Sequence, residues 1–162
     1  MSETNVTLAI LSQGWHVYQE HLSAALAPLS ADQLALRAAP GLRSIDEIAR
    51  HVIAVRSRWY HMALGVGDNA FAAIGQWDGA GSPPRAASEL VSGMAETWQV
   101  MQEALAGFTP ADLQGTIERE RDGKMHSLAR GWVVWHVIEH DLHHGGEISL
   151  TLGMNGLQAP DI

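Results

Sequence analysis

The segment Trp132–Ser149 constrains this chain most, because it places four histidines within nine residues of one expected helix. It contains no proline, and its apolar residues recur at helical spacing. At about 100° per residue, His136 and His140 lie one turn apart on the same face, with His143 and Glu147 about 20° to either side of His136. Two imidazoles at this spacing can bind one metal ion, as in other helical zinc motifs. A structural cluster of histidines is the alternative interpretation.

The metal hypothesis needs a third ligand from another segment, because one helix supplies only two good ligands to a single ion. Ser44-Ile-Asp-Glu predicts a helix start with a capping box, and this helix should run to about Leu64. His51 lies in the middle of its predicted buried face, whereas Arg50 and Arg56 are expected to point away. A core histidine with a backbone partner is the alternative for His51. The predicted metal ligands are His51, His136 and His140.

Other residues of the last helix are predicted to support the site. His144 lies about 80° around the helix from His136, near enough to orient a ligand or to bind substrate. His143 and Glu147 are assigned to the same supporting or substrate-binding group. If His140 and His144 are instead the ligand pair, the pocket lies one turn further along the helix.

Two more residues are considered for catalysis. Glu139 could act as a base near the metal, although its place off the histidine stripe suits a solvated carboxylate. Arg58 shares the face of His51 and could bind an anionic substrate, or could lie at the edge of the core. The residues His136-Val-Ile-Glu-His140 also spell the inverted zinc-protease motif. Such proteases need a distant downstream ligand and a further domain, and only 22 residues follow His140, so the chain is not expected to be a protease of this kind.

The rest of the chain also predicts helices. Apolar periodicity indicates helices over residues 4–28 and 86–107, and Ser30 and Thr109 each begin a short capped turn. A Gly- and Pro-rich connection spans residues 65–85. Asp122-Gly123 predicts a two-stranded hairpin, after which Ser127 is expected to cap the last helix. That helix is apolar nearly all round, which predicts that part of it meets a second subunit in a homodimer.

Composition excludes several classes of protein. With 162 residues, 46% hydrophobic and 17% charged, the chain should form a single domain over residues 1–162. A net charge of -8 argues against a nucleic-acid partner. The chain has no cysteine, no apolar run that could span a membrane and no signal-peptide pattern at its start. The expected location is the cytoplasm.

Two segments resemble the DinB/YfiT-like superfamily of metalloenzymes. They are Ser44-Ile-Asp-Glu-Ile-Ala-Arg-His51 and Trp135-His136-Val-Ile-Glu-His140-Asp-Leu-His-His144-Gly-Gly-Glu-Ile. The resemblance extends over essentially the whole chain, because helix order, the long second connection and the hairpin agree. It implies an all-α, up-down-down-up four-helix bundle, commonly dimeric. It also implies a divalent metal on His51, His136 and His140, with His144 supporting them.

The resemblance also implies a range of activities. Related members include thiol-dependent transferases and mycothiol-dependent isomerases, and the isomerases carry a further C-terminal domain that this chain is expected to lack. We therefore expect a metal-dependent hydrolase or thiol transferase that uses zinc or nickel and acts on a small molecule, with a thiol cofactor as a candidate partner. A dimeric helical bundle that a metal stabilises without catalysis is the alternative.

Overall fold

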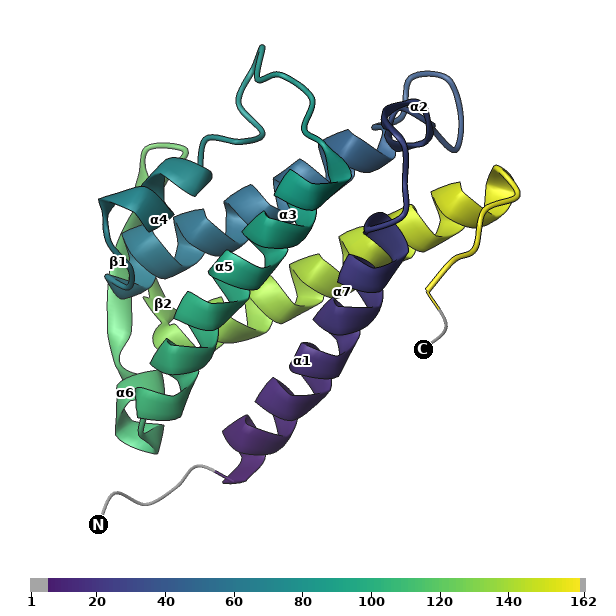
Figure 1. Cartoon of the computed structure of the whole chain (residues 1–162). Coiled ribbons are helices and arrows are strands. Elements are labelled where there is room, and N and C mark those ends of the chain that lie inside the picture. Colours follow the sequence, from purple (N-terminus) through teal and green to yellow (C-terminus); the bar gives the residue numbers. More distant parts are fainter. Residues whose placement is uncertain (1–5, 161–162) are drawn as a thin grey trace.

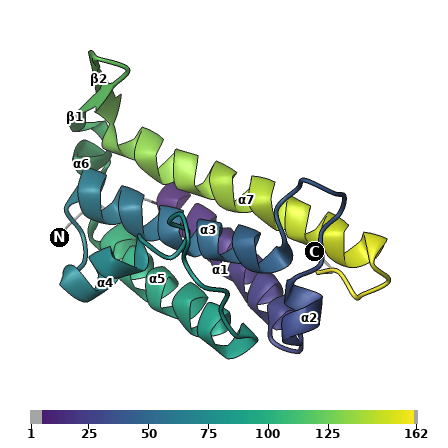
Figure 2. The same cartoon turned by 90° about the horizontal axis from the view of Figure 1, so that it is seen from above.

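The computed structural model describes residues 6–160 and is mostly helical (Figure 1). Its long helices are α1 (Val6–Leu26), α3 (Ile45–Arg58), α5 (Ala87–Gly107) and α7 (Arg130–Met154). Helix α5 packs on α1 and α3, and α3 also packs on α7. Figure 2 shows α7 running along one side of the molecule, with α3 beside it. No helix in this part of the chain combines the length and apolar character needed to cross a membrane.

Short elements connect the long helices. They are α2 (Ala31–Leu34), η1 (Trp59–Ala63), α4 (Asn69–Ile74), α6 (Pro110–Gln114), β1 (Thr116–Arg121) and β2 (Lys124–Ala129). The predicted side-chain caps of α2, α3 and α6 are confirmed, because Ser30, Ser44 and Thr109 each accept a hydrogen bond from the third residue of the helix that follows. Helix α3 continues directly into η1, a wider π-helical turn.

The predicted hairpin is confirmed directly before the last helix. Strands β1 and β2 pair antiparallel around the turn at Asp122-Gly123, where both residues have positive φ. The prediction that Ser127 caps the last helix is wrong. Ser127 lies in β2 opposite Glu118, and α7 begins at Arg130 without a side-chain cap. The ladder extends to Ala129 and so occupies the residues where a cap would form.

Two apolar clusters stabilise the arrangement of the long helices. One contains Leu22, Ile53, Met94 and Ile148, which are fully buried. The other lies toward the hairpin end and contains Tyr60, Met101 and Val137, also fully buried. The first cluster contains residues of α1, α3, α5 and α7, and the second contains residues of α1, α5, α7 and η1, the continuation of α3. Burying these apolar side chains away from water therefore holds the four long helices together.

A buried ion pair joins α3 to α7. Arg56 places Nη2 2.7 Å and Nε 2.8 Å from Oδ2 of Asp141, and both side chains are 0% exposed. Nε1 of Trp15 donates to the same oxygen over 2.7 Å. The prediction that Arg50 and Arg56 point away from the core is therefore wrong. Arg50 is also buried, at 7% exposed, where it pairs with Asp46. Each buried guanidinium group has a carboxylate beside it, Asp141 on α7 for Arg56 and Asp46 one turn earlier on α3 for Arg50, and this makes the buried charge tolerable.

Candidate metal centre

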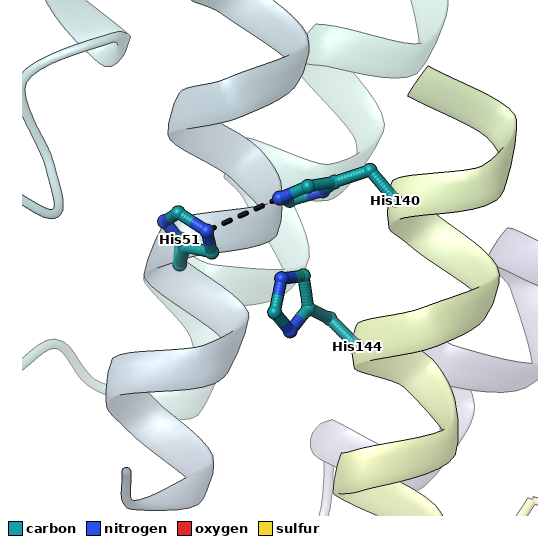
Figure 3. A group of neighbouring side chains, drawn as sticks. All are labelled: His51, His140 and His144. Atoms are coloured by element: carbon teal, nitrogen blue, oxygen red, sulfur yellow. Dashed lines mark hydrogen bonds between the residues drawn. The ribbon is translucent and has the colours of Figure 1, made fainter. Parts of the chain in front are cut away.

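Three histidines converge where α3 and α7 pack together. His51 projects from α3, and His140 and His144 project from successive turns of α7 (Figure 3). Nε2 of His51 lies 3.1 Å from Nε2 of His140. The ring centre of His144 is 4.9 Å from that of His51 and 4.3 Å from that of His140. One ring nitrogen from each histidine lies within 4.8 Å of the others, close enough for the three to approach one ion.

His136 lies outside this group. Its ring stacks on Trp132, with centroids 4.9 Å apart and planes 5° from parallel, and makes an edge contact with Trp59. The ring centre of His136 is 6.4 Å from that of His140. Of the three ligands predicted from the sequence, the structure thus brings together His51 and His140. It adds His144, the alternative member of a pair with His140.

The packing of α1 against α7 fixes which turn of α7 faces α3. A Cβ atom built on Gly145 would lie 1.9 Å from Oη of Tyr18, so only glycine allows this approach. Ile148 and Val137 on α7 are fully buried. With Gly145 held against α1, the preceding residue, His144, projects about 100° around the helix toward His51.

A carboxylate orients His51. Nδ1 of His51 lies 2.6 Å from Oδ2 of Asp78, in the loop after α4. Burial acts to raise the pKa of Asp78, but hydrogen bonds from Arg58 and His51 outweigh it and hold that pKa at about 2. The ionised carboxylate can only accept, so Nδ1 of His51 carries the proton and Nε2 presents a lone pair. Asp78 was not predicted from the sequence, because it lies in a loop outside every helical pattern.

His144 is oriented in a similar way. Its Nδ1 donates to Oε2 of Glu147 over 2.7 Å, and its other ring nitrogen points toward His51 and His140 (Figure 3). Nδ1 of His140 is buried and has no hydrogen-bond partner within residues 6–160. Nε2 of His140 lies 3.1 Å from the lone pair on Nε2 of His51, so in this arrangement Nε2 of His140 carries the proton and donates it, and a metal ion would have to displace that proton. Both Nε2 atoms of the close pair are nevertheless directed at the same point between the helices.

The site favours neutral imidazoles. Burial, and then the nearby histidines, lowers the pKa of His140 from 6.5 to about 3. Burial also lowers the pKa of His51, although the hydrogen bond to Asp78 partly offsets this effect. Both rings are therefore uncharged near pH 7, the form in which a histidine nitrogen can bind a metal.

The remaining candidate residues lie around this centre. Arg58 pairs with Asp78, with Nη2 2.9 Å from Oδ2, so it acts on His51 through that carboxylate. The side chain of Glu139 is 62% exposed and lies 3.7 Å from His136. The side chain of His143 is 67% exposed and lies 3.5 Å from Glu147. His143, His144 and Glu147 form a second group of close donors, but all three come from one helix, and the side chains of His143 and Glu147 are 67% and 43% exposed.

Asp78→Asn should weaken metal binding by about 10–100-fold, the range found for partners that orient metal-binding histidines. The amide can offer His51 a donor as readily as an acceptor, so it no longer fixes Nε2 as the free nitrogen. Competition against a chelator of known affinity measures the change. Glu139→Gln is the matched control and should leave affinity unaltered. Equal affinities for Asp78→Asn and the unaltered chain would show that Asp78 does not support the site.

Comparisons with known proteins support one family. A family model described as the DinB superfamily matches residues 12–148. A crystal structure of a DinB-like protein from Bacillus cereus ATCC 10987 matches with a TM-score of 0.74 and 19% identity, covering 100% of this chain and 99% of that one. A conserved protein from Enterococcus faecalis matches with a TM-score of 0.72 and 13% identity, covering 94% and 99%. No curated protein matches the chain. At these identities the structures indicate a shared fold.

Proposed function

The chain belongs to the DinB superfamily, and from that premise we propose that it binds one divalent transition-metal ion through His51, His140 and His144. The observation that carries this proposal is the convergence of three imidazoles from two helices. Two nitrogens bound to one tetrahedral zinc ion lie about 3.3 Å apart, given Zn–N bonds of about 2.0–2.1 Å. The 3.1 Å between the Nε2 atoms of His51 and His140 is close to that value. The donor set therefore fits zinc, and imidazole also suits nickel.

We further propose that the metal centre is catalytic. Three neutral ligands leave the positive charge of the ion uncompensated, and such an ion lowers the pKa of a bound water or thiol. This chemistry suits a hydrolase or a thiol transferase that acts on a small molecule. The residues of the chain contribute by holding the ligands in one tautomer, through Asp78 and Glu147. A metal that only joins α3 to α7 is the second candidate, favoured by the position of the site between these helices.

Metal analysis of the purified protein tests the first proposal. We expect close to one zinc or nickel ion per chain, and calorimetry should show the stripped protein taking up one equivalent. A preparation that contains no metal and binds neither ion would overturn the proposal. Thermal unfolding after chelation separates the two functions. A catalytic site should leave the stripped protein folded, since buried apolar clusters hold its helices together, whereas a purely structural ion should be needed for folding.

We also propose that α1, α3, α5 and α7 form an up-down-down-up four-helix bundle that pairs into a homodimer. The contacts of α5 with α1 and α3, and of α3 with α7, support the bundle. Large apolar side chains on α1 and α7 remain in contact with water, including Ile10 at 64%, Leu11 at 47%, Trp135 at 53% and Leu142 at 46% exposed. Burying them against a second copy would remove this surface from water.

Light scattering at micromolar concentration should therefore give the mass of two chains. Trp135→Glu should shift the protein toward the monomer, because it places a charge within the apolar surface. Exposed Glu139 provides the control, and Glu139→Gln should leave the dimer intact. A monomeric mass for the unaltered protein would contradict the proposal.

A further inference from the structure

A cavity of about 300 Å³ opens directly beside His51. It lies between the start of α3 and the loop that follows Trp77, and its lining includes Arg43, Arg50 and Asp78. Its volume is at the lower end of the range for small-molecule sites. A molecule in this cavity would lie next to one of the proposed metal ligands.

Most charges around this cavity already have partners. Glu47 lies 2.7 Å from Nη1 of Arg37, and Asp78 is paired with Arg58 and His51. Arg50 uses Nε for Asp46 and Nη1 for the carbonyl oxygen of Trp77. The carboxylates that line the cavity are therefore neutralised by cations that lie elsewhere.

Two guanidinium groups remain able to receive an anion. Arg43 is exposed and makes no hydrogen bond or ion pair within residues 6–160. Nη2 of Arg50 likewise has no hydrogen-bond partner in that part of the chain, although Arg50 itself is only 7% exposed. An anion could bind Arg43 without breaking an existing ion pair, in a protein whose net charge is -8.

Arg43 also lines a second cavity of about 370 Å³ between α3 and the last turns of α7. The walls of this second cavity include Leu42, Ile48 and Leu150, and also Glu147, the hydrogen-bond partner of His144. Leu42 and Leu150 are 53% and 60% exposed. Arg43 thus lies between a polar cavity beside His51 and a largely apolar one beside Glu147.

We propose that Arg43 binds the anionic group of a small organic anion, whose apolar part lies along Leu42, Ile48 and Leu150. This inference rests on the proposed metal centre, because the small organic anion is the class of substrate on which that centre would act. A carboxylate and a phosphate share the required chemistry, since both accept two parallel hydrogen bonds from a guanidinium group.

Calorimetric titration with hexanoate, hexyl phosphate and hexanol tests the proposal, on both the zinc-loaded and the stripped protein. We expect hexanoate or hexyl phosphate to bind and hexanol to bind far more weakly. The better of the two anions identifies the carboxylate or phosphate class. Arg43→Gln should weaken anion binding by about 10–100-fold, as expected for losing a hydrogen bond to a charged group. It should not weaken zinc binding, because the positive charge of Arg43 acts against a cation at His51. Arg43→Lys should retain part of the anion affinity.

Arg119→Gln is the matched control, because Arg119 is an exposed arginine that lines a different cavity near Trp59. It should leave anion binding unchanged. Anion binding that survives Arg43→Gln, or that equals hexanol binding, overturns the inference. Zinc binding without anion binding overturns the anion site and leaves the metal centre standing. If the protein binds the anion but takes up no zinc, the anion site is supported and the proposed metal function is overturned.

Discussion

His140→Ala is expected to abolish tight metal binding, whereas His136→Ala should leave it almost unchanged. His140 provides the nitrogen nearest to His51, at 3.1 Å, and also contacts His144. Removing it leaves two ligands, so the loss should exceed the 10–100-fold range found for supporting residues. His136 instead stacks on Trp132. Calorimetry with zinc, on protein stripped by a chelator, measures both affinities.

The remaining histidine variants decide between the two possible ligand pairs on α7. His144→Ala should be as damaging as His140→Ala, because His144 completes the group with His51. His143→Ala is the matched control, since the side chain of His143 is 67% exposed. Loss of metal in His136→Ala together with its retention in His144→Ala would contradict this assignment. The ligands would then be His51, His136 and His140, as the sequence predicts.

Asp141→Ala should lower the free energy of unfolding by about 3–5 kcal/mol, the cost of leaving one member of a buried ion pair without its partner. Arg56 would keep its charge in a position that is 0% exposed. Trp15 would also lose the acceptor that lies 2.7 Å from its Nε1. Urea denaturation followed by circular dichroism measures the change.

A double replacement separates the loss of the pair from the cost of an isolated charge. Arg56→Met combined with Asp141→Leu removes both charges and fills much of their volume, so it should recover most of the stability that Asp141→Ala loses. Full recovery is not expected, because Trp15 still lacks an acceptor. A double variant as unstable as Asp141→Ala would show that the hydrogen bonds of the network, rather than the unpaired charge of Arg56, dominate.

Local signals in the sequence determined the long helices, three of the predicted caps and the hairpin, but neither the start of the last helix nor α4. Ser30, Ser44 and Thr109 cap helices that begin at the next residue, and Asp122-Gly123 forms the turn of the hairpin. These features depend on residues within a few positions of one another, so a single segment contains all the information they need. The two histidine-containing segments also indicated the family, which the match over residues 12–148 confirms.

The tertiary structure decided which residues meet across the fold. His136 with His140 and His140 with His144 have the same four-residue spacing, so helical periodicity cannot choose between them. The choice depends on how α7 is rotated and shifted against α3, and contacts such as Tyr18 with Gly145 set that position. Its place on the helical wheel puts Arg56 on the side of α3 away from His51, and only the fold brings it to Asp141, 85 residues along the chain. Asp78 lies 27 residues after His51, in a loop without periodicity. Such pairings depend on packing between distant segments, which the pattern within either segment does not contain.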